Sequence, residues 1–221
     1  IAHEIRNPLS AISQANALLA EDLQADVGAQ RLAAMVDSNV KRLQRIVDEV
    51  ALLAAPLPVE SARLDAKALV QEVCDDWLRT QPKETAEAVA LALDPAVGAV
   101  QFDAEHLRRV LINLLDNGWR HAQDAPPAWL QVTLDSLDER QVRLAVVNPG
   151  PPMSPEVERH MFEPFFSSRS RGSGLGLTIC RELCERYGAR IDYQARLVQG
   201  TPAVAFVVTL RGLPALNAES H

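Results

Sequence analysis

Two long amphipathic stretches at the start of the chain constrain its fold more than any other feature. The first runs from Ile1 to about Leu23 and repeats apolar side chains at helical spacing. In the second, the apolar side chains are Leu32, Val36, Leu43, Ile46, Val50 and Leu53. The polar turn QADVG separates the stretches, and Asn39 stands at an inner position of the second stripe. This spacing is that of a coiled-coil seam and predicts an α-helical hairpin.

A single hairpin of two helices is too thin to bury the apolar residues on both of its faces. Two hairpins packed together as a four-helix bundle would bury them, so we predict a homodimer. The alternative is one hairpin that packs on the rest of the same chain.

The stretch AAPLPVES ends the helical pattern, because Pro56 and Pro58 disfavour a helix. Beyond it we expect helices over 65–79, from the N-cap Asp103 to His121, and from near Gly174. Strand patterns fall at 88–93, 98–103, 129–135, 141–148, 191–193 and 203–210. Mixed elements of this kind predict an α/β sandwich with a mixed sheet. The predicted domains are a hairpin over 1–55, a linker over 56–62, a sandwich over 63–213 and a tail over 214–221.

Composition narrows the classes of function. The net charge of −7 argues against nucleic acid, which requires a basic surface. The three cysteines are odd in number, which argues against a disulfide framework and favours a reducing cytosol. Cys180 and Cys184 could share a metal, but no other Cys or His at zinc spacing completes a site, so buried small residues are favoured. With no long apolar run and no initiator Met, we expect a soluble, excised fragment.

The stretch HEIRNPL places His3 and Asn7 one helical turn apart, with Glu4 about 100° round the helix. A nucleophilic imidazole needs a group that accepts its second proton, which Glu4 could be, and Asn7 could orient a water. A metal ligand or an ordinary surface histidine is the alternative. Pro8 removes an amide donor and should bend the helix just beyond this turn.

Two later stretches offer groups that suit a phosphate ligand. LINLLDNGWRHA sets Asn113 and Asn117 on one helical face, with Arg120 and His121 a turn later. A carboxamide oxygen suits Mg²⁺, and Arg120 suits phosphate, although a surface Asn pair is the alternative. RGSGLGLTIC offers backbone amides and a helix N-terminus to an anion. Between these stretches, MFEPFFSSRSRG places three aromatic residues close together: Phe162, Phe165 and Phe166. Taken alone, such residues belong either to a core or to an exposed apolar patch.

These stretches, in this order, resemble the motifs of bacterial two-component sensor histidine kinases. HEIRNPL resembles the phosphoacceptor motif, LINLLDNGWRHA the N box, MFEPFFSSRSRG the F box and ATP lid, and RGSGLGLTIC the second glycine box. The resemblance implies a HisKA dimerisation hairpin followed by a HATPase_c α/β sandwich of the GHKL (Bergerat) type. The subgroup it resembles most is that of the nitrogen- and pilus-regulation sensor kinases.

The resemblance also implies roles for individual residues. His3 would accept the γ-phosphoryl group of ATP, Glu4 would act as base, and Asn7 would position water for phosphatase activity. Asn117 would ligate Mg²⁺. Phe162, Phe165 and Phe166 would anchor the mobile ATP lid, and Arg169 could reach phosphate. The residues implied to bind ATP are Asn113, Asn117, Arg120, His121, Asn148, Gly150, Phe166, Arg169, Gly172, Gly174, Leu175 and Gly176.

The first glycine box departs from the family pattern. The sequence has NPGPP where Asp-x-Gly-x-Gly is usual, so Asn148 replaces the carboxylate that accepts the adenine amino group. A neutral acceptor in its place should cost on the order of 1 kcal/mol. Pro152 replaces a glycine, and a proline fixes φ and lacks a backbone N–H. In the N box, Gly118 stands where Ala is commoner. Variants of this form occur in the family, so we expect weakened base recognition rather than a dead site.

The resemblance implies a function for the whole fragment: autophosphorylation of His3 by MgATP, then transfer to a response-regulator aspartate. Its partners would be a second copy and a cognate regulator, for this subgroup of the sigma-54-activating type. The fragment would be the cytoplasmic domain of a protein anchored in the bacterial inner membrane. A fragment that mainly dephosphorylates its regulator and a non-catalytic dimeric scaffold are the alternatives. Related gyrase- and chaperone-type ATPases lack the His-bearing hairpin.

Overall fold

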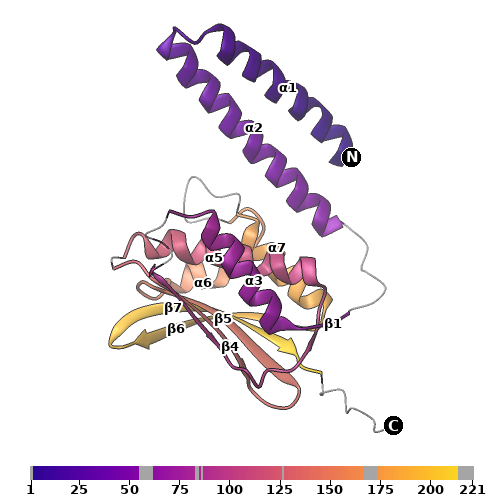
Figure 1. Cartoon of the computed structure of the whole chain (residues 1–221), viewed down its shortest axis with the longest axis vertical. Helices are drawn as coiled ribbons and strands as arrows, with labels where there is room; N and C mark the ends of the chain where they lie inside the picture. The colour runs from indigo at the N-terminus through magenta and orange to yellow at the C-terminus, as the bar shows by residue number, and fades with distance from the viewer. Residues whose placement is uncertain are drawn as a thin grey trace. The chain divides into compact units, whose positions relative to one another are not determined.

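The computed structural model contains two compact units, one formed around a helical hairpin and the other around an α/β sandwich (Figure 1). The structure describes residues 2–54, 62–82, 85, 87–125, 127–166 and 174–213. Within these ranges, the side chains of residues 2–4, 45, 49 and 52–54 lie outside the description. Among the described helices, none has the length and apolar content needed to cross a membrane.

The hairpin consists of α1 (Ala2–Asp22) and α2 (Val27–Ala54), as the two amphipathic stretches predict. Asp26 in the polar turn begins α2, since its carboxylate accepts hydrogen bonds from the amides of Gly28 (2.8 Å) and Ala29 (3.0 Å). Pro8 lies inside α1, which continues as a helix on both sides of it. The proline therefore does not end the helix, and the bend expected from it stays a prediction.

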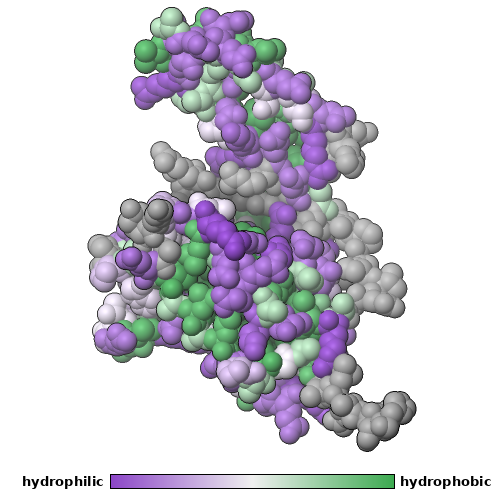
Figure 2. All heavy atoms as spheres, viewed as in Figure 1, coloured by the Kyte–Doolittle hydropathy of each residue, from purple (hydrophilic) through white to green (hydrophobic). Residues whose placement is uncertain are grey.

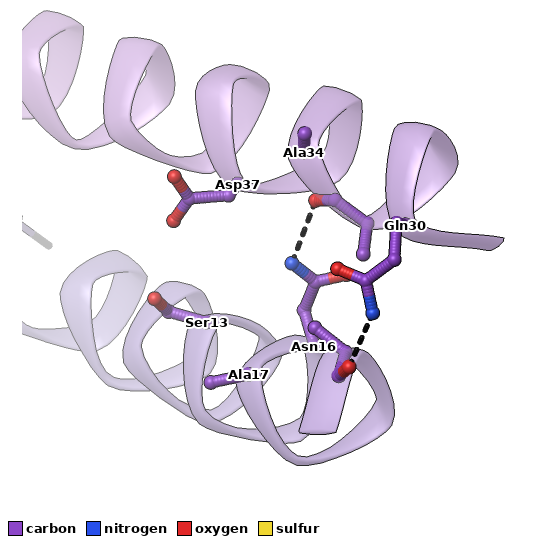
Figure 3. A pocket seen from close by; sticks show the side chains of 8 residues that line it. Ser13, Asn16, Ala17, Gln30, Ala34 and Asp37 are labelled. Atoms are coloured by element: carbon purple, nitrogen blue, oxygen red, sulfur yellow. Dashed lines mark hydrogen bonds between the residues drawn. The ribbon is translucent and has the colours of Figure 1, made fainter. Parts of the chain in front are cut away.

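Polar bonds tie the two helices of the hairpin together. The Asn16 carboxamide donates to the carbonyl of Ala33 across the hairpin at 2.8 Å, and Gln30 donates to the carbonyl of Ala20 in the reverse direction (Figure 3). These bonds border a shallow hollow of about 260 Å³ lined mainly by alanines, Ser13 and Asp37. Side-chain-to-backbone bonds between helices fix one axial register, because a shift by one residue would break both of them.

Two sets of apolar residues in the hairpin differ in their exposure. Leu9 and Val40 are buried between α1 and α2. A second set, at seven-residue intervals in each helix, is 40–55% exposed: Ile5, Ile12, Leu19, Val36, Leu43 and Val50. Figure 2 shows apolar residues, in green, at the surface of the hairpin. Asn39, predicted at an inner position, is exposed in the hairpin and donates to the carbonyl of Met35 at 2.8 Å.

The sandwich has one mixed five-stranded sheet and a separate pair of short strands. The large sheet has the order β2-β4-β5-β7-β6, in which β2 and β4 are parallel and all other neighbours are antiparallel. The strands are β1 (Arg63–Leu64), β2 (Val89–Leu93), β3 (Val100–Gln101), β4 (Leu130–Ser136), β5 (Gln141–Pro149), β6 (Arg190–Val198) and β7 (Thr201–Arg211). β1 and β3 pair with each other. The prediction of a mixed sheet is therefore confirmed.

Helices cover one face of this sheet (Figure 1). They are α3 (Ala66–Arg79), α5 (Ala104–Ala122), α6 (Pro155–His160) and α7 (Gly176–Arg186). The predicted N-cap Asp103 accepts from the amide of His106 at 2.9 Å, and Asp65 caps α3 in the same way. One face of α5 is buried, at Leu107, Val110, Leu111, Leu114, Leu115, Gly118 and Ala122. This spacing places α5 at the centre of the core.

Replacing Leu114 with Ala should destabilise the sandwich by about 2–5 kcal/mol, because the side chain is fully buried and would leave a cavity. Leu197→Ala, at a side chain 75% exposed on β6, is the matched control and should change stability by less than about 0.5 kcal/mol. The tryptophans of the chain all lie in the sandwich, at Trp77, Trp119 and Trp129. Urea unfolding followed by tryptophan fluorescence therefore reports on this unit, and equal midpoints for the two variants would contradict the core position of α5.

Candidate functional site

The predicted phosphoacceptor turn lies in the first part of α1. His3 and Glu4 are within this helix, but their side chains lie outside the described residues. Asn7 is one turn beyond residue 3, is exposed, and hydrogen-bonds to no described residue. Beside it, Arg6 pairs with Asp48 of α2 at 2.8 Å. This ion pair joins the first turns of α1 to the second helix at the place where the predicted chemistry would occur.

The predicted N box lies on α5 against the start of α7. The Asn113 carboxamide is half-buried and donates a long hydrogen bond, 3.4 Å, to the carbonyl of Gly176, the first residue of α7. A Cβ added to Gly176 would stand 3.9 Å from the Asn113 amide. Asn117, one turn along α5, is half-buried and makes no hydrogen bond to a described residue. The structure thus brings Asn113 and Gly176 together and leaves the Asn117 carboxamide available.

The two basic residues of the N box are placed differently. Arg120 is exposed at the end of α5, whereas His121 is half-buried. Both lie in the last turn of the helix, where positive charge interacts favourably with the carbonyl end of the helix dipole.

Asn148 is the most buried polar residue of the predicted nucleotide site. Its side chain lies on β5 with 2% of its surface exposed, and its Nδ2 donates to the carbonyl of Pro149 at 2.9 Å. No donor among the described residues reaches its Oδ1. A buried acceptor without a donor costs roughly 1–3 kcal/mol. The orphaned oxygen is therefore a physical reason to expect a ligand that brings a donor.

Gly118 of α5 faces this carboxamide. A Cβ at Gly118 would lie 3.5 Å from Oδ1 of Asn148 and only 3.0 Å from Cδ2 of Leu130 on β4. The helix therefore packs on the sheet more closely than a larger residue allows without movement of Leu130. This contact explains the glycine that the sequence carries where Ala is commoner in the family.

The loop after β5 is attached to two neighbouring strands. Gly150 has a φ of +153° and donates its amide to the carbonyl of Pro202 at 3.0 Å. The amide of Met153 donates to the hydroxyl of Tyr193 on β6 at 2.8 Å. Pro152 lies between these attachments and is exposed. The proline thus stiffens a loop that hydrogen bonds already hold at both ends.

The predicted F box is anchored through Phe162 rather than through Phe165. The carbonyl of Phe162 accepts a hydrogen bond from the Thr178 hydroxyl at 3.1 Å, and its ring meets Phe206 edge-on at 6.4 Å. The Arg181 guanidinium lies 5.7 Å from the same ring. Phe165, expected to be an anchor, is instead 67% exposed. Sequence reasoning missed Thr178, a buried polar residue two positions inside α7.

The ends of the predicted lid approach each other at Phe165 and Gly174. Both have a positive φ, and a Cβ on Gly174 would stand 2.5 Å from the Phe165 backbone, so only glycine fits there. Phe166 is half-buried and Leu175 is buried. Arg169 and Gly172 fall in 167–173, outside the described residues.

The cysteines behave as buried apolar residues. Burial raises the pKa of the Cys74 and Cys180 thiols to about 12, and it raises the pKa of Cys184 as well. Thiols with such pKa values stay protonated at neutral pH and are poor metal ligands. Among the described residues there is also no cluster of three or more His, Cys, Asp or Glu side chains that could hold a metal.

Comparison with known proteins gives two family matches. Residues 1–55 match the His Kinase A (phospho-acceptor) domain, and residues 102–212 match the histidine kinase-, DNA gyrase B-, and HSP90-like ATPase. The chain is 37% identical over 201 residues to the sensor protein kinase PilS of Pseudomonas aeruginosa, an alignment that covers 89% of this chain and 37% of that protein. It spans less than half the length of the curated relatives it matches.

Two solved structures have the same fold. Full-length ShkA in complex with AMPPNP aligns with a TM-score of 0.74 at 22% identity, over 97% of this chain and 45% of that one. Histidine kinase ThkA, in complex with the response regulator protein TrrA, aligns with a TM-score of 0.68 at 24% identity, over 98% and 61%. The predicted fold class, a hairpin followed by an α/β sandwich of this type, is confirmed.

The two family matches occur together in one chain. The ATPase match alone includes gyrase- and chaperone-type proteins, but the phospho-acceptor match over the hairpin separates this chain from them. The chain therefore belongs to the family of two-component sensor histidine kinases, with a phospho-acceptor hairpin followed by an ATPase-type sandwich.

Proposed function

We propose that this chain is the core of a protein-histidine kinase that phosphorylates His3 with MgATP and passes the phosphoryl group to an aspartate of a response regulator. The observation that carries the proposal is the buried, donorless oxygen of Asn148 inside the ATPase-type unit of a chain that also has the phospho-acceptor hairpin. The adenine amino group would supply the missing donor.

The remaining contacts to the nucleotide follow from the placement of α5 and α7. The N-terminus of α7, beside Asn113, would offer its first backbone amides to phosphate. Arg120 and His121, together with Arg169 of the lid, would add positive charge or hydrogen bonds. The free carboxamide of Asn117 would ligate Mg²⁺, whose charge, once bound, neutralises phosphate oxygens. Gly150, Phe166, Gly172, Gly174 and Leu175 would border the nucleotide.

The transfer itself needs few protein groups. An imidazole nitrogen of His3 attacks the γ-phosphorus, and a nitrogen–phosphorus bond forms as the phosphorus–oxygen bond to ADP breaks, with its electron pair leaving on ADP. Glu4 accepts the proton of the other imidazole nitrogen. A response-regulator aspartate then attacks the phosphohistidine. The ThkA complex with a response regulator supports a partner of this class, and the sigma-54-activating type is our expectation for it.

Substitution of His3 tests the acceptor. After incubation with γ-labelled ATP and Mg²⁺, the wild-type chain should carry label that is lost in acid and stable in base, as a phosphoramidate is. His3→Gln should reduce the label to background. Label that survives acid, or that persists in the variant, would contradict phosphohistidine at this position. Circular dichroism of the variant checks that the hairpin is still helical.

The position of Asn7 supports a second activity, the dephosphorylation of the response regulator, because the Asn7 carboxamide is exposed beside the acceptor turn. Asn7→Ala should lower the rate of regulator dephosphorylation at least about tenfold, in line with the loss of a group that orients water, and leave autophosphorylation nearly unchanged. The two rates are measured separately, with phosphorylated regulator and with labelled ATP. A parallel fall in both rates would show that Asn7 does not act on water alone.

The hairpin supports a homodimer. The exposed apolar set at seven-residue intervals has the pattern of a bundle interior and would be buried by a second hairpin. Burying charge in such an interior is costly, so Leu43→Glu should shift the chain from dimer to monomer in light scattering. Val27→Glu, at a side chain 83% exposed at the turn, is the control and should remain dimeric. A dimeric Leu43→Glu variant would place the interface elsewhere.

A further inference from the structure

Asn148 differs chemically from the aspartate it replaces, because a carboxamide carries both an acceptor and a donor. A carboxylate can only accept a hydrogen bond, whereas a carboxamide turned by 180° presents its Nδ2 in place of its Oδ1. Only 2% of the surface of Asn148 is exposed. Water therefore does not compete for hydrogen bonds to the carboxamide, and the atom that faces the ligand determines whether the site accepts or donates a hydrogen bond.

One hydrogen bond sets the orientation of this carboxamide. Nδ2 donates to the carbonyl of Pro149 at 2.9 Å, which leaves Oδ1 as the atom without a partner among the described residues. If the carboxamide turned over, Oδ1 would face the Pro149 carbonyl, and this hydrogen bond would be lost. Gly118 carries no side chain that could oppose the turn, although a Cβ added there would lie 3.5 Å from the carboxamide oxygen. The orientation is thus held by a single neutral hydrogen bond.

We propose that the Pro149 carbonyl, by orienting the Asn148 carboxamide, sets the preference of the site for one purine base, and that the site accepts 6-oxopurine nucleotides as secondary substrates. This inference rests on the proposed nucleotide site. With Oδ1 facing the base, the site accepts a hydrogen from a 6-amino group. With the carboxamide turned, Nδ2 donates to a 6-carbonyl, as in inosine or guanosine nucleotides. The turn forfeits one neutral hydrogen bond and leaves Oδ1 facing the Pro149 carbonyl without a donor, which corresponds to a loss in binding on the order of tenfold or more.

An aspartate at this position would discriminate far more strongly. No orientation of a carboxylate donates to a 6-carbonyl, so the base and the buried carboxylate would both be left without a partner. Sites with such unpaired polar groups reject the wrong ligand by orders of magnitude. The relaxed preference therefore follows from the carboxamide, and Asn148→Asp should remove it.

The test is calorimetric titration of the full chain at pH 8 and in Mg²⁺ with three triphosphates: ATP, ITP, and purine riboside triphosphate, which lacks any 6-substituent. The wild-type chain should bind ATP about tenfold more tightly than ITP. In Asn148→Asp the ATP-to-ITP ratio should be at least about ten times the wild-type ratio. Purine riboside triphosphate should bind more weakly than ATP to both proteins. Gln141→Glu, an exposed position at the other end of β5, adds the same charge and should keep the wild-type ratio.

The outcomes separate this inference from the function on which it rests. Equal ATP-to-ITP ratios in the wild-type chain and Asn148→Asp would overturn the inference while leaving ATP binding intact. Equal binding of ATP and purine riboside triphosphate to the wild-type chain would also overturn it, because Asn148 would then not read the 6-position. If no triphosphate bound at millimolar concentration, the proposed kinase function would fail, and the inference with it. Labelling of wild-type His3 by γ-labelled ITP, more slowly than by ATP, would extend the result from binding to transfer.

Discussion

The close contact between α5 and the sheet at Gly118 is the constraint on which the arrangement of the sandwich depends. The helix lies so near β4 that a single added carbon would reach Leu130. Because the apolar side of α5 is fixed in this way, Asn113 and Asn117 lie on its flank, where Asn113 contacts the start of α7. The same contact places α5 over the Asn148 carboxamide. Core packing therefore determines where the polar groups of the proposed nucleotide site stand.

Local sequence patterns predicted most elements because their residues repeat at helical or strand period. The long helices α3 and α5 begin at the aspartates that cap them, and β4 and β5 lie on two of the predicted strand patterns and pair antiparallel. The six-residue helix α6 was missed, since it is too short to show a period and buries no residue. The order of strands could not be read locally either. β7 lies between β5 and β6, because it pairs not only with β6, its neighbour in the sequence, but also with β5, which is distant in the sequence.

For the candidate site, motifs identified residues but not their interactions. The resemblance pointed to Asn148 and Asn113, yet nothing in the sequence indicates that the former lacks a donor or that the latter touches Gly176. Thr178 carries no motif signal, because its role is to hold the Phe162 carbonyl across a gap of sixteen residues. Phe165 was wrongly expected to be an anchor. Aromatic spacing alone does not tell which of several neighbouring rings turns inward.

The hairpin shows how one apolar stripe can serve two interfaces. Leu9 and Val40 close the contact between α1 and α2, while Asn16 and Gln30 fix their register through polar bonds to the backbone. Those bonds leave little freedom for the helices to slide, so the exposed set at Ile5, Ile12, Leu19, Val36, Leu43 and Val50 keeps one fixed geometry. A partner hairpin would therefore meet a preformed surface. Binding to a preformed surface avoids the entropy cost of ordering it, which favours a stable bundle even when each hairpin buries few residues of its own.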